Sequence, residues 1–362
     1  MLVLVRIPER HARPLRVNET RRHSRVVPVP GLRFRTNPAV RCVALGKATL
    51  NHEIWALDHN EGEVVPRAAL SAETGPAGQP AGVGAAHPLA ASVAAVDRAV
   101  DWMSFRLLDT PGAPLPPCGQ WTTCDQALSD PACFTRWRGA VAQRLAQQHA
   151  HVPEQTTAAH VLQWYLGIPT YLGAMLFHSA RRVPSLQPPQ LAFRLDLAWV
   201  QEVALRPGLF WCLPDDPDAG HPDAIRVRDE VALAAVLRHQ VVTHAARFLK
   251  VYGPLVRFGR RTLWAAVTDM LDVALLIAGR SFGSAQAGAT DARLVLAKRE
   301  EPLTSASTTC EVIDEHGRTH WIRRRGWCCF TYALPGVEHP CASCPRVCDA
   351  ERLRILGTLD SN

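Results

Sequence analysis

This sequence has no hydrophobic run that could cross a membrane uninterrupted. Its two longest apolar stretches are residues 158–177 and 263–278. Pro169 lies within the first, and Asp269 and Asp272 lie within the second. A carboxylate at the centre of a bilayer costs about 3 kcal/mol. We therefore expect no membrane span, and we expect the first stretch to be a buried helix broken near Pro169.

The sequence also lacks an export signal, a glycine-rich phosphate loop and internal repeats. The apolar run at residues 1–5 is too short for a signal-peptide core, and arginine and proline follow it closely. We therefore expect a cytoplasmic protein. The absence of a phosphate loop argues against an ATP-dependent synthetase.

Acidic residues are scarce in the first fifty positions. These positions hold ten Arg and one Lys but only Glu9 and Glu19, a net charge of +9, so the rest of the chain sums to 7 − 9 = −2. A basic segment with little apolar periodicity is typical of a solvated tail, although peripheral contact with an anionic membrane stays open. The nearly neutral body argues against a nucleic-acid partner.

The remaining composition is that of a globular protein, with 362 residues of which 47% are hydrophobic and 20% charged. We expect four segments. They are a basic, disordered tail at 1–39, an N-terminal segment at 40–91 that ends in an Ala/Gly/Pro-rich linker, a helix-rich substrate-binding domain at 92–308, and a C-terminal hairpin with a cysteine module at 309–362.

Hydrophobic periodicity predicts a helix-rich α+β fold. Helices are expected from Leu89 through Leu107, after the Asp130-Pro131 cap, on either side of Pro169, and over 229–251 and 254–279. Short apolar runs between 191 and 227 predict a small antiparallel sheet. Residues 310–313 and 319–322 alternate in the manner of a β-hairpin.

Cysteine is abundant, and several of the eleven residues cluster near the C-terminus. Four fall within seventeen positions: Cys328, Cys329, Cys341 and Cys344. The pattern is C-C-x11-C-x2-C, with Cys348 close behind. A C-x2-C step lets two thiolates converge on one metal, and the adjacent pair reaches the same centre when the intervening loop folds back. Four thiolates suit either Zn²⁺ or a [2Fe-2S] core, whereas disulfides are disfavoured by the absence of an export signal.

The residues around these cysteines resemble a known family. The segment Arg324-Arg-Gly-Trp-Cys-Cys-Phe-Thr-Tyr-Ala-Leu-Pro-Gly336, followed by Cys341-Ala-Ser-Cys-Pro345, resembles the C-terminal signature of ferric-siderophore reductases (FhuF-like). The likeness is specific over the last forty residues and looser over the last two-thirds, including 264–280. One departure is a spacing of x11 where the family has x10. A loop absorbs one extra residue easily, but this leaves open whether Cys344 or Cys348 closes the site, and we assign Cys344.

The resemblance implies a [2Fe-2S] cluster on Cys328, Cys329, Cys341 and Cys344. It also implies an oxidoreductase that reduces iron(III)-siderophore to iron(II) by one-electron transfer and releases the iron in the cytoplasm. The implied partners are the ferric siderophore and a ferredoxin or NAD(P)H-dependent electron donor. Two alternatives stay open: a non-catalytic binding protein with a structural Zn(Cys)4 tail, and a relative of the siderophore synthetases.

Residues beside the cysteines are candidates for tuning the cluster and for binding the chelate. Four arginines are placed in sequence to favour the added electron, or else form a solvated hairpin edge: Arg323, Arg324, Arg325 and Arg346. Three aromatic residues are candidates for an apolar platform, or else for the core of the module: Trp327, Phe330 and Tyr332.

The other cysteines and the central histidines are interpreted as structural. Cys118, Cys124 and Cys133 form C-x5-C-x8-C, which matches no metal template, and we expect them to be buried small side chains. Cys42, Cys212 and Cys310 are isolated. The helical spacing of four histidines gives no clean i, i+4 pair on one face, so we interpret them as packing or surface residues: His160, His178, His239 and His244.

Overall fold

The computed structural model describes residues 86–110, 112–115, 121–196, 198–313, 317, 319–337 and 339–359. All of them belong to one unit of the chain, Lys47–Asn362. The expected basic tail, nearly all of the 40–91 segment, Cys42 and Cys118 lie outside the described residues, as does most of the turn expected between the two hairpin strands.

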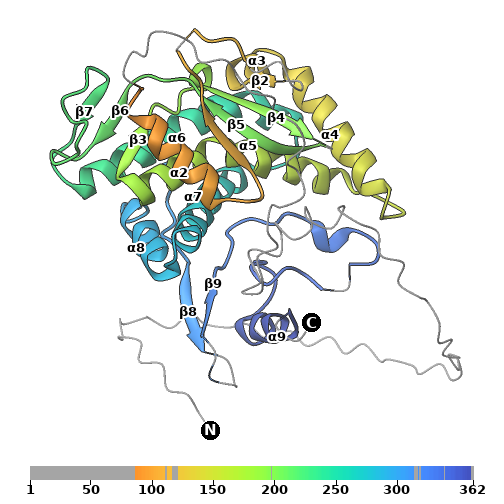
Figure 1. Ribbon diagram of the computed structural model, residues 1–362. Coiled ribbons are helices and arrows are strands. Elements are labelled where there is room, and N and C mark those ends of the chain that lie inside the picture. Colours follow the sequence, from red (N-terminus) through yellow and green to blue (C-terminus); the bar gives the residue numbers. More distant parts are fainter. Residues whose placement is uncertain are drawn as a thin grey trace, which may run out of the picture. The chain divides into compact units, whose positions relative to one another are not determined.

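The described residues form a helix-rich α+β fold, as the sequence predicts (Figure 1). The helices are α2 (Leu89–Ala99), α3 (Cys124–Ser129), α4 (Pro131–Ala146), α5 (Glu154–Ala180), α6 (Glu230–Tyr252), α7 (Arg260–Ser281), α8 (Ala285–Val295) and α9 (Asp349–Leu359). Short 3-10 turns are η1 (Pro188–Gln190), η2 (Gly253–Leu255) and η3 (Thr331–Ala333).

The strands of the described residues form small sheets. One has the order β1 (Ser104–Leu107), β5 (Trp199–Leu205), β4 (Leu191–Asp196) and β2 (Trp121–Thr123). A second has the order β3 (Arg182–Pro184), β6 (Phe210–Cys212) and β7 (Ala224–Arg226), and β8 (Cys310–Ile313) pairs with β9 (Thr319–Ile322). The antiparallel β4–β5 pair and the hairpin confirm the prediction, whereas the parallel pairs β1–β5 and β6–β7 were not predicted.

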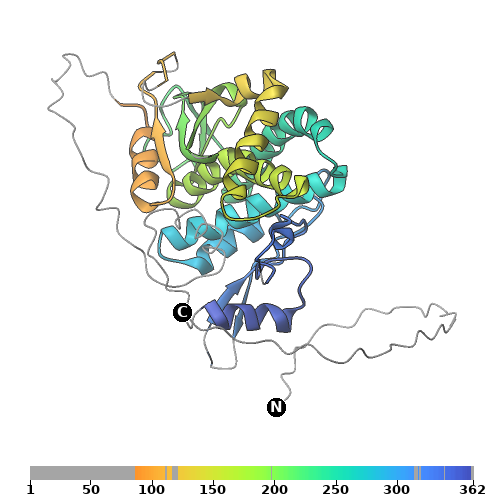
Figure 2. The same cartoon turned by 90° about the vertical axis from the view of Figure 1, so that its right-hand side faces the viewer.

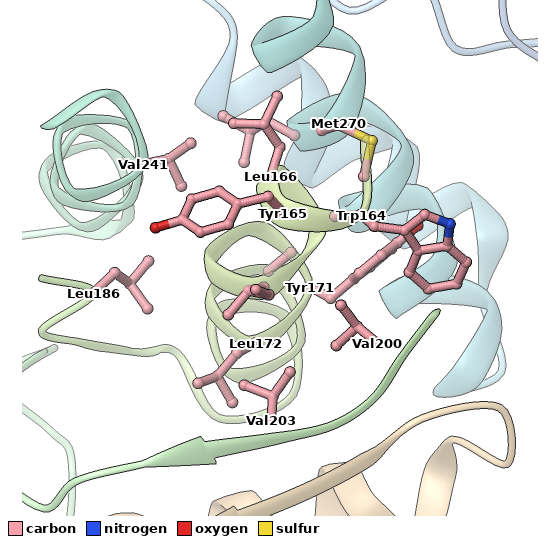
Figure 3. Close-up of a cluster of buried hydrophobic side chains, with 14 of the residues drawn as sticks. Trp164, Tyr165, Leu166, Tyr171, Leu172, Leu186, Val200, Val203, Val241 and Met270 are labelled. Atoms are coloured by element: carbon pink, nitrogen blue, oxygen red, sulfur yellow. The ribbon is translucent and has the colours of Figure 1, made fainter. Parts of the chain in front are cut away.

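Helix α5 lies at the centre of the core. Nearly every residue of its 156–177 stretch is buried, as expected of a helix that is apolar on all sides. Figure 3 shows Tyr165 pointing toward Val241 of α6 and toward Leu186, while Val203 of β5 lies against Leu172. The helix thus packs on another helix and on a sheet at once, which explains why its apolar pattern has no polar face.

The predicted break of this helix at Pro169 is wrong, because α5 continues without interruption from Glu154 to Ala180. A proline inside a helix removes one backbone hydrogen bond. Here it is flanked on both sides by fully buried turns, and the Thr170 hydroxyl donates to the Leu166 carbonyl at 2.8 Å. Tertiary packing along the whole helix outweighs the cost of the proline.

The prediction of a helix from Leu89 through Leu107 is also wrong in its second half. Helix α2 ends at Ala99, Val100 has extended dihedrals, and residues 104–107 form β1. The Phe105 N–H donates to the Asp97 side chain at 2.9 Å, and β1 pairs with β5. The sheet therefore recruits residues whose apolar spacing also suits a helix.

The other predicted helices lie close to the positions that the sequence predicts. The Asp130 side chain caps α4 by accepting the Ala132 N–H, with Pro131 as the first helical residue. Asp229 caps α6 in the same way. Helix α7 begins at Arg260 rather than at 254, because the chain first forms η2.

By length and composition α7 is a candidate membrane span, but 83% of its apolar window is buried inside the protein, as in a core helix.

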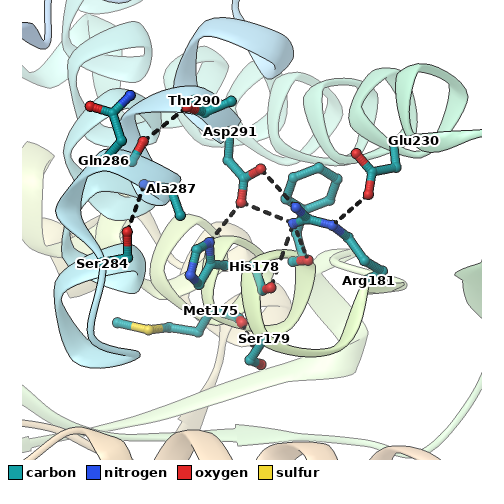
Figure 4. A network of polar contacts seen from close by, with 11 residues as sticks. Met175, His178, Ser179, Arg181, Glu230, Ser284, Gln286, Ala287, Thr290 and Asp291 are labelled. Carbon is teal, nitrogen blue, oxygen red and sulfur yellow. Dashed lines mark hydrogen bonds and ion pairs between the residues drawn. The ribbon is translucent and has the colours of Figure 1, made fainter.

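Polar contacts fix the end of α5 to two neighbouring helices (Figure 4). Asp291 of α8 accepts hydrogen bonds from both terminal nitrogens of Arg181, at 2.9 and 3.0 Å, and lies 2.7 Å from Nδ1 of His178. Arg181 also pairs with Glu230 at the start of α6. Asp291 is 2% exposed, so these partners compensate a buried carboxylate.

The C-terminal residues pack against the helical body through a shared core. Trp327, Cys329 and Leu334 belong to the main apolar cluster of the molecule. Figure 2 shows the β8–β9 hairpin and α9 beside each other, and Ile322 of β9 packs against Ile355 of α9 in a separate small cluster. The cysteine segment, residues 328–348, contributes to both apolar clusters, with Cys329 in the first and Ala342 in the second.

Candidate metal centre at the C-terminal cysteines

The cysteine segment connects strand β9 to helix α9. The adjacent cysteines lie in an irregular stretch after β9, while Cys341 and Cys344 close a tight turn in which the Cys344 N–H donates to the Cys341 carbonyl at 2.9 Å. The Arg325 N–H donates to the Ser343 carbonyl at 3.0 Å and joins the two stretches. The two halves of the cysteine pattern are therefore side by side.

The four predicted ligands converge in a closed ring of sulfur contacts. Cys328 contacts Cys329, Cys329 contacts Cys341, Cys341 contacts Cys344, and Cys344 contacts Cys328. None of them forms a disulfide. Cys329 and Cys344 are buried, and the other two are half-buried. Cys348 is exposed, and none of the ring contacts involves it.

Each sulfur of the ring receives one hydrogen bond from the surrounding chain. Cys328 accepts the Phe330 N–H at 3.4 Å, and Cys329 accepts the Thr331 hydroxyl at 3.3 Å. Cys341 accepts the Ser343 hydroxyl at 3.9 Å, and Cys344 accepts a backbone hydrogen bond from Arg346. Such donors stabilise electron-rich, metal-bound thiolates and tune their redox potential.

The four thiols influence one another's pKa values. A hydrogen bond from Cys329 lowers the pKa of the Cys328 thiol, whereas burial raises the pKa of Cys329. Hydrogen bonds to neighbouring sulfurs raise the pKa of Cys341 and Cys344. Adjacent buried thiols resist ionising together, and a metal centre supplies the positive charge that holds all of them as thiolates. The residues therefore fit a metal centre with four thiolate ligands.

The predicted tuning arginines differ in their positions. Arg325 is 5% exposed, and its charge partly opposes the rise in the pKa of Cys329, which burial causes, and of Cys341, which the hydrogen bond to Cys329 causes. Arg323 is also buried and donates to the Asp269 carbonyl at 2.9 Å. Arg324 is exposed. Arg346 is also exposed, and its guanidinium lies over the ring of Tyr332. Among the described residues, Arg325 is thus an arginine whose charge favours the thiolate form of two of the sulfurs.

Asp269 of α7 fixes the backbone immediately before the cysteines. Its carboxylate accepts the Gly326 N–H at 2.8 Å and the Trp327 N–H at 3.1 Å. Burial raises the pKa of Asp269 to about 6, against the opposing effects of Arg323, these N–H groups and Arg325. In the sequence, the charge of Asp269 argued only against a membrane span. A carboxylate inside an otherwise apolar helix nevertheless indicates that this carboxylate has a specific buried partner.

Asp272, one helical turn further along α7, fixes the segment that leads into β8. It accepts the Ser307 hydroxyl, the Thr308 N–H at 3.0 Å and the Thr309 hydroxyl at 3.2 Å. The Thr308 hydroxyl donates in turn to the Arg324 carbonyl at 2.8 Å. One face of α7 therefore positions both the entry to the hairpin and its exit toward the cysteines.

Helix α5 and the loop before it contact the segment between the cysteine pairs. The Thr156 hydroxyl donates to the Phe330 carbonyl at 3.0 Å, and Nδ1 of His149 lies 2.8 Å from the Pro335 carbonyl. Phe330 has φ +60°, a left-handed conformation that is strained for an aromatic residue. These anchors hold the eleven-residue loop against the body.

The aromatic residues near the cysteines differ from the expected platform. Trp327 is 3% exposed and belongs to the core, so it cannot form an exposed platform. Phe330 and Tyr332 are half-buried; Phe330 stacks on Phe258 with 5.8 Å between centroids, and Arg346 lies 4.7 Å above Tyr332. Phe258, which the sequence analysis missed, thus extends the aromatic surface.

The other cysteines and the histidines occupy structural positions. Cys124 and Cys212 are buried, Cys133 is half-buried, and Cys310 is exposed. His244 and His160 are buried in the core, His178 pairs with Asp291, and His239 is exposed. The expectation of packing or surface roles agrees with these positions.

Comparisons with known proteins add little to this site. No protein-family model matches the chain, and no curated protein matches it in sequence. Among solved structures, the aerobactin synthetase IucC from a hypervirulent pathotype of Klebsiella pneumoniae is 12% identical, with a TM-score of 0.31. The match covers 48% of this chain and 32% of that one, so the chain spans about a third of that protein's length. A similarity at this level carries no argument about fold or function.

Proposed function

We propose that this chain is an iron-sulfur oxidoreductase that reduces iron(III) held in a siderophore. The observation that carries the proposal is the closed ring of Cys328, Cys329, Cys341 and Cys344, with one hydrogen-bond donor for each sulfur. The resemblance of the surrounding segment to ferric-siderophore reductases supports a [2Fe-2S] cluster there.

The chemistry of the substrate explains why one electron suffices. Hydroxamate and catecholate oxygens are hard donors that suit iron(III), and they bind the softer iron(II) far less tightly. A [2Fe-2S] cluster, when bound, supplies one electron at a time. The electron originates from a ferredoxin or an NAD(P)H-dependent donor, and its addition to iron(III) gives iron(II), which leaves the chelate in the cytoplasm.

The chain's own residues would shield the centre and position the chelate. The buried sulfurs of Cys329 and Cys344 and the core residue Trp327 limit the access of water. Phe330 and Tyr332 lie directly after the first cysteine pair and are partly exposed, so an apolar chelate could rest on them close to the sulfurs. Outer-sphere transfer needs proximity and no nucleophile or general acid.

A structural Zn(Cys)4 site is the second candidate, because four thiolates also suit Zn²⁺. Anaerobically purified full-length protein separates the two. We expect a coloured protein that contains iron and acid-labile sulfide, an electron paramagnetic resonance signal after dithionite, and release of iron(II) from a ferric siderophore to a ferrous chelator. Colourless, folded protein with stoichiometric zinc would reject the reductase.

The ligand assignment predicts different outcomes for two neighbouring cysteines. Cys344→Ser removes a buried member of the ring, whereas Cys348→Ser changes an exposed residue outside it. We expect the first variant to lose most of its iron and sulfide and the second to retain both, as measured by metal analysis and visible absorption. Loss of iron from Cys348→Ser would overturn the choice of Cys344.

A further inference from the structure

The aromatic residues beside the cysteines continue into an exposed cation. Phe258 precedes α7 and stacks on Phe330, with 2° between the ring planes and 5.8 Å between the centroids. The ring centroids of Phe330 and Tyr332 are 6.5 Å apart, and the Arg346 guanidinium lies 4.7 Å from the centre of the Tyr332 ring. We propose that these four residues, hereafter the aromatic surface, bind ferric tris-catecholates in preference to ferric tris-hydroxamates. The inference rests on the proposed function and names the substrate class of the same site.

The aromatic surface is connected to the sulfur ring through two backbone hydrogen bonds. The Phe330 N–H donates to the Cys328 sulfur at 3.4 Å, and the backbone of Arg346 donates to the Cys344 sulfur. Each cysteine pair thus has a residue of the surface bonded to one of its sulfurs. A chelate that rests on the side chains of Phe330 and Arg346 is therefore close to the centre that would supply its electron.

Solvent reaches every member of the aromatic surface. Phe258, Phe330 and Tyr332 are half-buried, and Arg346 is exposed. A guanidinium that lies over an aromatic ring can still bind an anion, because its N–H groups point outward in its own plane. The surface therefore presents aromatic rings and a hydrogen-bonding cation to the same ligand, which suits a ligand that is both aromatic and negatively charged.

The two segments that carry the aromatic surface have a positive charge. Residues 257–261 hold three Arg and no acidic residue, a net charge of +3, and residues 323–354 hold six Arg and three acidic residues, again +3. The carboxylate of Glu154, on which Arg257 acts, is already paired with Arg138 at 2.6 Å. An oxidised [2Fe-2S] cluster with four thiolates would add about −2, so the net charge stays positive. An anionic chelate is therefore attracted to this side of the protein, whereas a neutral chelate is not.

The two classes of chelate differ in the properties that the aromatic surface recognises. Three hydroxamate groups neutralise the charge of iron(III) and bring no aromatic ring to the metal. Three catecholate groups give a trianionic complex in which an aromatic ring carries each pair of donor oxygens. Arg346 therefore contributes mainly to binding of the tris-catecholates, and ring contacts with Phe258 and Phe330 add to the same preference.

Gallium(III) chelates test the aromatic surface without electron transfer, because gallium(III) is similar in size to iron(III) and is not reduced by an iron-sulfur centre. Anaerobically purified full-length protein is titrated by calorimetry at low ionic strength with two gallium complexes. One is the trianionic complex of a hexadentate tris-catecholate, and the other is the neutral complex of a hexadentate tris-hydroxamate. We expect the first complex to bind at least about tenfold more tightly, with a difference that decreases as salt is added.

Variants of the aromatic surface should affect the tris-catecholate complex selectively. We expect Arg346→Gln to weaken its binding about fivefold and Phe258→Leu about threefold, whereas Arg346→Lys retains the charge and should keep most of the affinity. Binding of the neutral complex should change less in each variant. Arg226→Gln, at an exposed position of β7, is the control and should bind both complexes as the wild type does.

Three results would refute the preference. They are equal affinities for the two gallium complexes, an affinity for the tris-catecholate complex that Arg346→Gln leaves unchanged, and binding of an acidic ferredoxin by a protein that binds neither complex. Colourless zinc protein that still binds the gallium tris-catecholate would refute the reductase but not this surface. A reductase that binds both gallium complexes equally would refute the surface but not the reductase.

Discussion

The hydrogen bonds to the sulfurs act at the scale of single residues. Thr331 donates its hydroxyl to Cys329, and in the proposed [2Fe-2S] centre this bond would be stronger after addition of an electron, because the sulfur would then be more negative. A donor of this kind therefore favours the reduced state. Its removal should make the protein a stronger reductant that is harder to reduce.

Thr331→Val removes the hydroxyl at nearly constant volume. We expect the midpoint potential to fall by tens of mV, since a differential interaction of about 1 kcal/mol corresponds to roughly 40 mV for one electron. Redox titration followed by electron paramagnetic resonance measures the shift. Thr331→Ser retains a hydroxyl and should stay near the wild-type potential; equal potentials in all three proteins would show that the bond has no tuning role.

Among the secondary-structure elements, helix α7 fixes the backbone next to the first cysteine pair. Asp269 accepts two backbone N–H groups next to Cys328. Oδ2 of Asp269 accepts both N–H groups, and Oδ1 also faces the Gly326 N–H at 3.1 Å, so in Asp269→Asn the amide NH2 replaces this second acceptor and points at the N–H. We expect the proposed cluster to be lost about tenfold faster in the presence of an iron chelator, because buried donors that face each other without an acceptor cost about 1–3 kcal/mol. The decay of visible absorption measures this rate.

Thr268→Val is the matched control on the same helix. Within the described part of the chain, the Thr268 hydroxyl donates to the Trp264 carbonyl of the same helix at 3.2 Å, so its loss should not affect the cysteines. Identical decay rates for Asp269→Asn and Thr268→Val would contradict the proposed support. A change in helix content of Asp269→Asn by circular dichroism would indicate a general folding defect instead.

The crossing of α7 and α8 depends on two glycines. A Cβ atom on Gly279 would lie 2.5 Å from the Gly288 nitrogen and from the Ser284 carbonyl oxygen, both of which are backbone atoms that cannot move aside. We expect Gly279→Ala to lower the free energy of unfolding by about 3 kcal/mol, at the upper end for overpacking. Gly139→Ala, at an exposed position of α4 where a Cβ atom would have no neighbour within 4 Å, should instead stabilise the protein by up to about 1 kcal/mol. Urea denaturation of both variants tests the contrast.

Sequence reasoning succeeded for elements whose signals are local. The cap at Asp130 and the hairpin depend on residues close together in the chain. It failed where distant packing decides, as at Pro169 in α5 and at β1, which pairs with a strand about one hundred residues away. Asp269 was missed as a site residue for the same reason, because Gly326 is 57 positions away.

At the scale of the whole molecule, the cysteine segment and the helical body share one core. Cys329 and Trp327 belong to the same apolar cluster as α5, α6 and α7. We therefore expect changes deep in the body to reach the cysteine segment through global stability rather than through direct contact. His244, at the centre of this core, allows the stability of the body to be probed by pH.

His244 is fully buried and makes hydrogen bonds suited to a neutral ring. Nδ1 lies 2.6 Å from the Leu186 carbonyl and Nε2 lies 3.2 Å from the Tyr165 hydroxyl, so the ring donates to the first and accepts from the second. Burial lowers the pKa of His244 to about 4, from 6.5. Between these values the unfolded chain binds a proton that the folded chain does not, so stability is full above pH 6.5 and falls as the pH is lowered toward 4.

We expect this residue to account for about 3 kcal/mol of stability lost between pH 6.5 and pH 4, since one pKa unit corresponds to 1.36 kcal/mol. His244→Asn lacks a titrating ring, so the variant should be less stable than wild type at pH 7 but should lose less on acidification. Urea denaturation monitored by tryptophan fluorescence from pH 4.5 to 7.5 gives both profiles. His239→Asn, exposed on the same helix, should follow the wild-type profile, and parallel profiles for His244→Asn and wild type would show that protonation of His244 is not what weakens the fold in acid.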